Sequence, residues 1–115
     1  MAIFEAWDVV AVPFPYTDKA TRQRRPALVI SAGSLQDDHG LLWVLMITSA
    51  ENRAWPDDVA ISDMISAGLP APSVVRTAKI ATIEAKDAEK LGTVPPVVRE
   101  SVAAALDRRF SARRS

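Results

Sequence analysis

The chain has 115 residues and carries 14 basic and 14 acidic side chains, so its formal net charge at pH 7 is zero. This balance does not indicate a globally basic nucleic-acid-binding protein, although it is compatible with a local basic patch. The absence of cysteine excludes disulfides, thiolate nucleophiles and cysteine-ligated metal sites. Apolar residues make up 49% of the chain, which suits a single packed domain spanning residues 1–115. We see no signal peptide and no membrane span, because the run 41–47 is far shorter than the ~20 residues that cross a bilayer, so we expect a cytoplasmic protein.

The first half of the chain is rich in apolar and β-branched residues and predicts mostly β-strands. Strands are predicted at residues 7–12, 26–31, 41–48 and 58–61. The run 41–48 is almost continuously apolar, so we expect a central strand that is buried on both faces, with Trp43 in the core. The loop before Pro26 is long enough to suggest a function, and the polar run 32–40 predicts a turn.

The second half of the chain predicts short helical segments on either side of a β segment. Ser62 is expected to cap a short helix, which ends at Gly68. Residues 73–76 and 78–83 predict either one bent strand or a pair of strands. A helical turn is expected at residues 87–91.

An amphipathic helix is predicted at residues 97–110, where apolar residues recur at spacings of three and four. Pro95 and Pro96 suit the N-terminus of this helix. Arg108 and Arg109 fall in its last turn, where positive charge interacts favourably with the helix dipole. Strands followed by a long helix predict an α+β fold, with a small, barrel-like, mainly antiparallel sheet and a C-terminal helix.

The residue inventory leaves few routes to catalysis. His39 is the one histidine, and its place beside a glycine in a polar turn is typical of a surface residue. The acidic pairs Asp37–Asp38 and Asp57–Asp58 are interpreted as solvated turn residues, so no metal site is predicted. Neither a glycine-rich phosphate loop nor a Ser-His-Asp spacing is visible, so the residues that most hydrolase mechanisms need are missing.

One reaction needs few protein groups, namely the transesterification of RNA at its own 2′-hydroxyl. The protein has to hold the phosphate in line, stabilise charge on its oxygens and manage two protons. Arginine suits phosphate because its planar fork makes two parallel hydrogen bonds, and Arg22, Arg24 and Arg25 cluster before one predicted strand. Thr48 and Ser49 end the central strand with hydroxyl groups, although such a threonine more often only caps a turn. If the two strands are adjacent and antiparallel, Arg25 and Thr48 can lie close together.

Several segments of the sequence resemble the PemK/MazF family of toxin endoribonucleases. They are WDVVAVPFPYTD at residues 7–18, RRPALVIS at 24–31, ITS at 47–49 and AGLPAPSVVRTAKIATI at 67–83. The closing segment LGTVPPVVRESVAAALDRRF is also similar to the end of that family. The resemblance therefore covers nearly the whole chain, with the segments in the same order.

The resemblance implies a compact, SH3-like barrel that is shared with gyrase-poisoning toxins of the CcdB type, and usually a homodimer. It implies cleavage of single-stranded RNA, including mRNA, at short sequences and without a metal or another cofactor. The products would carry a 2′,3′-cyclic phosphate or 3′-phosphate and a 5′-hydroxyl. It also implies a cognate antitoxin, whose extended acidic C-terminal segment covers the RNA groove.

The family's catalytic arginine stands directly before a proline, and its catalytic threonine ends the third strand, so the resemblance implies Arg25 and Thr48 here. Pro26 restricts Arg25 to extended conformations, which positions the guanidinium in advance. Because arginine keeps its proton in proteins, we expect it to stabilise the phosphate or donate a proton, and Asp18 or a bound water is the candidate base. The assigned RNA-binding residues are Phe14, Tyr16, Thr17, Arg22, Arg24 and Ser49. Their aromatic rings are expected to stack on bases, and the others are expected to contact phosphate or sugar.

The chain departs from the family pattern at two positions. The family usually has glycine where this chain has Trp7, a difference that bears on the entry into the first strand. It often has aspartate where this chain has Ala78, a difference that bears on the partner of Lys79 and on dimer or RNA contacts. Neither departure affects Arg25 or Thr48.

Two other functions remain open on the same fold. The first is a non-catalytic module that binds an antitoxin-like peptide or another protein, with Trp7 or Trp55 as anchors. The presence of both Arg25 and Thr48 counts against it. The second is a DNA topoisomerase poison, a class that relies on C-terminal aromatic anchors, whereas this chain ends in DRRFSARRS.

Overall fold

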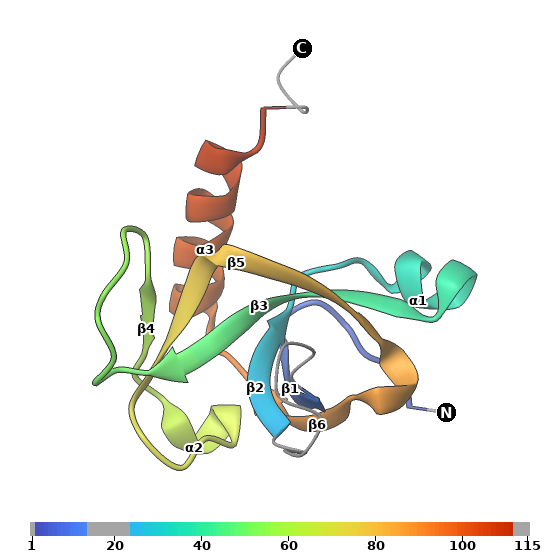
Figure 1. Cartoon of the computed structure of the whole chain (residues 1–115), viewed down its shortest axis with the longest axis horizontal. Coiled ribbons are helices and arrows are strands. Elements are labelled where there is room, and N and C mark those ends of the chain that lie inside the picture. The colour runs from blue at the N-terminus through green and yellow to red at the C-terminus, as the bar shows by residue number, and fades with distance from the viewer. Residues whose placement is uncertain (1, 14–23, 112–115) are drawn as a thin grey trace.

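The computed structural model describes residues 2–13 and 24–111. The strands are β1 (Asp8–Pro13), β2 (Arg24–Val29), β3 (Leu41–Ser49), β4 (Val59–Ile61), β5 (Ser73–Glu84) and β6 (Glu89–Thr93). The helical segments are α1 (Gly33–His39), α2 (Met64–Ala67), the 3-10 turn η1 (Ala85–Asp87) and α3 (Pro96–Arg109). The strands form one antiparallel sheet in the order β4-β5-β3-β2-β1-β6. Figure 1 shows this sheet curled like part of a barrel with α3 against one side, which confirms the predicted α+β fold.

The curled sheet has an apolar core on each of its faces, because side chains alternate along a strand. On one face Leu28 and Leu45 pack with Val98 and Val102 of α3, as the helical spacing predicted. The other face buries residues such as Val10, Ala27, Val29, Val44 and Met46 under Phe4 from the N-terminal segment. The central strand β3 contributes to both cores, so its nearly continuous apolar sequence has a structural reason.

Trp43 is the exception along β3, and the expectation that it lies in the core is wrong. Its side chain is 48% exposed, although it shares a face with Leu45. The cluster under α3 includes Leu45 and Ile47 but not Trp43. An apolar residue in a central strand is therefore buried only where another element covers its face.

The polar run after β2 forms the helix α1, so the expected turn at residues 32–40 is wrong. The side chain of Gln36 is buried and connects this helix to the N-terminal segment. Its Oε1 accepts a hydrogen bond from Phe4 N at 3.0 Å, and its Nε2 donates to Ala2 O at 2.7 Å. Because these partners are more than thirty residues away, local composition could not reveal them.

Residues 87–91 do not form the expected helical turn. The turn η1 ends at Asp87, and the following residues pair with β1 as strand β6. Gly92 lies where this strand meets α2, and a Cβ atom there would stand 2.2 Å from Ser66 O. The glycine therefore permits close packing of the two elements and does not end a helix.

The short helix α2 begins one residue later than expected. Asp63, and not Ser62, is its N-cap, because the Asp63 side chain accepts hydrogen bonds from both the backbone N and the hydroxyl of Ser66. The bond from the Ser66 backbone lowers the pKa of Asp63 from 3.8. Gly68 ends the helix with φ 71°, as predicted.

Trp7 adopts φ 79°, a left-handed backbone conformation that residues with a side chain rarely adopt. The conformation turns the chain into β1, and Trp7 N donates to Val29 O at 2.7 Å. Glycine adopts this conformation without steric cost, which explains why the resemblance places glycine here. In this chain the indole packs against the core beneath α3, and this burial offsets the backbone cost.

We expect Trp7→Gly to be more stable than Trp7→Ala by about 1 kcal/mol, because alanine keeps the steric cost of a positive φ. Both variants lose the same indole packing, so their difference isolates the backbone. Urea unfolding of the two variants measures that difference. An alanine variant as stable as the glycine variant would show that the backbone at position 7 is not strained.

Candidate functional site: a groove between Arg25 and Thr48

The antiparallel pairing of β2 and β3 brings the two predicted catalytic residues to the same level of the sheet. Ala27 pairs with Met46, and the same register continued by two residues places Arg25 opposite Thr48. Both residues line an open groove of about 350 Å³. The other residues that line it are Arg24, Pro26, Ile47, Ser49, Asn52, Leu69, Pro70, Ala71, Pro72 and Ser73. The predicted Arg25, Thr48 and Ser49 are therefore gathered at one surface.

A second, smaller hollow of about 60 Å³ adjoins the same two residues. It is lined by Arg25, Met46, Ile47, Thr48, Arg76 and Lys79. Arg76 and Lys79 were not among the predicted site residues. The available signal was the pair of cations within the otherwise uncharged strand sequence SVVRTAKIATI, which indicates side chains with a specific task. With them, three cations surround Thr48.

The shape of β5 explains how Arg76 and Lys79 reach this hollow. Ile47 pairs with Val75 and Leu45 pairs with Ile80, so residues 76–79 all stand opposite Met46 alone. This irregularity bends the strand, as Figure 1 shows, and confirms one bent strand over a pair. The extra residues turn two cations toward the end of β3 that carries Thr48.

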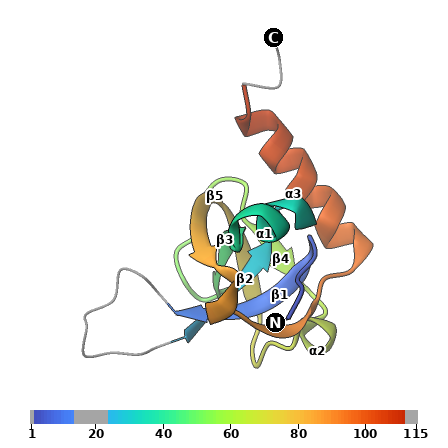
Figure 2. The same cartoon turned by 90° about the vertical axis from the view of Figure 1, so that its right-hand side faces the viewer.

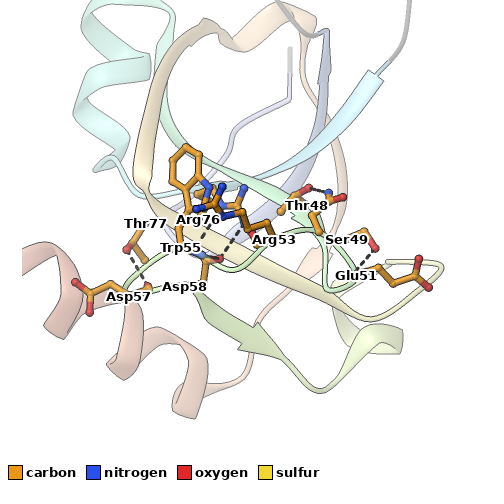
Figure 3. Close-up of polar contacts among 10 residues, drawn as sticks. Thr48, Ser49, Glu51, Arg53, Trp55, Asp57, Asp58, Arg76 and Thr77 are labelled. Carbon is orange, nitrogen blue, oxygen red and sulfur yellow. Dashed lines mark hydrogen bonds and ion pairs between the residues drawn. The ribbon is translucent and has the colours of Figure 1, made fainter.

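Arg76 is held in place by the segment between β3 and β4. Its Nη2 and Nε bind Asp58 at 3.0 and 3.3 Å, and the side chains of Arg76 and Asp58 are only 11% and 9% exposed. Nη2 also donates to Arg53 O at 2.8 Å, and the guanidinium lies 4.3 Å from the centre of the Trp55 ring. Figure 3 shows Arg76 between the indole and the carboxylate. Asp58 is therefore an ion-pair partner, and the expectation that it is solvated is wrong.

The hydroxyl groups at the end of β3 both accept hydrogen bonds from the residues that follow. Thr48 Oγ1 accepts from Asn52 Nδ2 at 2.5 Å, and Ser49 Oγ accepts from Glu51 N at 3.2 Å. Figure 3 shows Thr48 and Ser49 side by side at the start of this segment. Thr48 thus caps a turn and also lines the groove, so the two interpretations of this residue are compatible.

The side chain of Arg24 points away from β3 and toward β1. Its Nη2 donates to Ala11 O at 3.1 Å and to Asp87 O at 3.0 Å, so it reaches across β1 to the turn η1. The structure therefore separates the Arg24 guanidinium from the pair Arg25 and Thr48, although Arg24 borders the groove. The remaining predicted residues lie outside the described part of the chain: Phe14, Tyr16, Thr17, Asp18 and Arg22.

Asp57 is also paired, and its interpretation as a solvated turn residue is wrong. Arg108 and Arg109, in the last turn of α3, each donate to one of its carboxylate oxygens at 2.8 Å. The hydrogen bond from Arg108 is the main reason that the pKa of Asp57 lies below 3.8. The contact joins α3 to the segment that carries Asp58 and Asn52. No sequence pattern indicates a partner about fifty residues away.

We expect the Asp57 contact to make the stability of the protein depend on pH. Because the folded-state pKa is lowered, the contribution is complete above the ordinary value of 3.8 and is lost as the pH falls through the folded-state pKa. Asp57→Asn should therefore lower the melting temperature at neutral pH, and its difference from wild type should shrink below about pH 4. Asparagine tolerates the φ of 68° at this position, so the backbone is retained.

Glu100→Gln, on the exposed surface of α3, is the matched control because it also removes one negative charge. Thermal unfolding of the three proteins across the acid range measures the effect. A difference between Asp57→Asn and wild type that stays constant with pH would show that the carboxylate charge contributes nothing.

Other kinds of site find little support in the described residues. Within residues 2–13 and 24–111, no three histidine, cysteine or acidic side chains gather where they could hold a metal ion. The helices in this part of the chain are too short or too polar to cross a membrane. His39, Asp37 and Asp38 are exposed on α1, in agreement with a surface position.

The chain belongs to the family of PemK-like, MazF-like toxins of type II toxin-antitoxin systems, whose pattern it matches over residues 5–110. The match includes β2, β3 and β5, the strands whose residues line the groove. A search among curated protein sequences finds no match.

Several solved structures share the fold. MazF (Form-I) from Deinococcus radiodurans superposes with a TM-score of 0.76 at 23% identity, over 95% of this chain and 97% of that chain. MazE-MazF (Form-II) from the same organism gives 0.75 at 23% identity, over 95% and 96%. An endoribonuclease in complex with its cognate antitoxin, from Mycobacterial species, gives 0.72 at 18% identity, over 94% and 93%. At these identities the similarity shows a common fold.

Proposed function

We propose that this toxin is an endoribonuclease that cleaves single-stranded RNA, mRNA included, within short sequences and without a metal ion. The observation that carries the proposal is the register of β2 and β3, which sets Arg25 and Thr48 at one groove. The nucleophile of such a reaction belongs to the substrate, so the few potential catalytic side chains of this protein suffice for the reaction. We expect the protein to act in the cytoplasm, where mRNA is present.

The proposed reaction is an in-line attack of the ribose 2′-oxygen on the adjacent phosphorus. The P–O2′ bond forms while the P–O5′ bond breaks, giving a 2′,3′-cyclic phosphate and a 5′-hydroxyl. A base takes the 2′ proton, and the leaving 5′-oxygen receives a proton. Arg25 stabilises the charge on the phosphate oxygens or donates to the leaving oxygen, and Thr48 donates a hydrogen bond to the phosphate.

The groove also suits the rest of an RNA strand. Ser49 lies beside Thr48, and Lys79 adds a cation at the adjoining hollow. Arg22, Arg24 and Thr17 are proposed to contact phosphate or sugar, and Phe14 and Tyr16 to stack on bases. Asp18 or a bound water is the proposed base.

We expect Arg25→Ala to lower single-turnover cleavage of a mixed single-stranded RNA by about 100-fold or more, because one charge-stabilising donor is worth about 3–4 kcal/mol in such sites. The assay contains EDTA, and the melting temperature is measured in parallel to show that the variant is folded. Arg99→Ala is the matched control, because Arg99 is an arginine on α3 that binds Val94 O and lies outside the groove.

Full cleavage by folded Arg25→Ala would remove this mechanism. Near wild-type cleavage by Asp18→Asn would exclude Asp18 as the base. If the wild-type protein cleaves no RNA, the alternative is a peptide-binding module on the same fold, and a DNA supercoiling assay would identify a topoisomerase poison.

We propose that a cognate antitoxin neutralises the toxin by covering this groove with an extended, acidic C-terminal segment. The proposal rests on the family and on the cations Arg25 and Lys79, which suit carboxylates as well as phosphates. The endoribonuclease from Mycobacterial species with which this chain shares its fold was solved with its cognate antitoxin.

We also propose a homodimer, formed through an exposed apolar surface that is separate from the groove. Trp43, Trp55, Ile80 and Phe110 are each 41–48% exposed. Ile80, Trp55 and Phe110 line one hollow of about 340 Å³ between β5 and α3, which we call the apolar hollow. Such a surface in a small domain favours burial between subunits.

We expect light scattering at micromolar concentration to give twice the 12.5 kDa of one chain. Ile80→Asp should reduce the mass to that of one chain, because the charge would be buried in the interface. Ile65→Asp is the matched control, since Ile65 on α2 is exposed but does not line the apolar hollow. A wild-type protein with the mass of one chain would contradict the dimer.

A further inference from the structure

The amide of Asn52 makes the shortest hydrogen bond among those described for the groove. Its Nδ2 donates to Thr48 Oγ1 at 2.5 Å. The neighbouring Ser49 hydroxyl is also an acceptor, because Glu51 N donates to Ser49 Oγ at 3.2 Å. At the end of β3, both hydroxyl oxygens therefore accept a hydrogen bond from the residues that follow.

A hydroxyl group has one proton to donate, and its direction depends on what the oxygen accepts. When Oγ1 accepts from Asn52, the proton of Thr48 points to another acceptor. The accepted bond also polarises the hydroxyl, which strengthens its own donation. Because Thr48 lines the groove beside Arg25, a phosphate bound in the groove would be such an acceptor.

We infer that Asn52 is a positioning residue, which turns the Thr48 hydroxyl into a hydrogen-bond donor toward the phosphate in the groove. The inference rests on the proposed function and adds a residue that this function does not assign. Asn52 acts through Thr48 and needs no contact with the reacting atoms.

The backbone around Asn52 is fixed well enough for such a role. Ala50 N donates to Pro72 O at 3.0 Å, and Asn52 N donates to Ser49 O at 3.0 Å. One residue further on, Arg53 O accepts from the largely buried Arg76. The Asn52 amide therefore extends from a turn whose backbone is fixed on both sides. A catalytic hydroxyl keeps its orientation only when the residue that binds it is itself held rigidly.

The test compares single-turnover cleavage by Asn52→Asp and Asn52→Ala. A carboxylate has the same shape as the amide but no proton to donate, so it accepts the Thr48 proton and turns the donor away from the phosphate. We expect a loss of about 100-fold for Asn52→Asp and about 10-fold for Asn52→Ala, with RNA affinity less affected. Ala50→Asp controls for the added negative charge, because position 50 is exposed in the same turn.

The deciding measurement is a double-mutant cycle with Thr48→Val, which keeps the shape of the side chain and lacks the hydroxyl. If Asn52 acts through Thr48, adding Asn52→Asp to Thr48→Val causes little further loss. Equal cleavage by Asn52→Asp and Ala50→Asp, or losses that add fully, would overturn the inference while the ribonuclease activity stands. A wild-type protein that cleaves no RNA would overturn the proposed function and this inference with it.

Discussion

The antiparallel ladder between β2 and β3 is the constraint on which the groove depends. Ala27 and Val29 on one strand and Val44 and Met46 on the other are buried on the same face. A shift of one residue would turn these side chains to the opposite face, which has its own core under α3, so the fit of both cores fixes the register. The same register sets Arg25 opposite Thr48. The packing energy of the core thus also determines the spacing of the two groups that the proposed chemistry needs.

The segment between β3 and β4 connects this groove to the rest of the molecule. It supplies Asn52 to Thr48, Asp58 to Arg76 and Asp57 to the end of α3. Because the Arg76–Asp58 pair is largely buried, its two charges balance each other inside the curled sheet. Arg76 therefore lies near Thr48 with its charge balanced by Asp58. Figure 2 shows α3 outside the sheet, where its last turn can reach this segment.

The two sides of β5 serve different purposes. The bend at residues 76–79 turns Arg76 and Lys79 toward Thr48. Ala78 and Ile80, in the same part of the strand, line the apolar hollow beneath the end of α3. A single irregularity in one strand therefore separates a charged surface from an apolar one. The proposed RNA or antitoxin would occupy the charged side, and the proposed second copy of the chain would cover the apolar one.

The sequence alone determined the features that depend on residues adjacent along the chain. Alternating and continuous apolar patterns located most strands and α3, and the motifs around Arg25 and Thr48 identified the family, since both signals are local. Tertiary structure alone decided which polar side chains are buried or paired. Gln36 of α1 binds the N-terminal segment, and Asp57 binds arginines of α3. These partners are far apart along the chain and meet only when the sheet curls, so no local pattern indicates them.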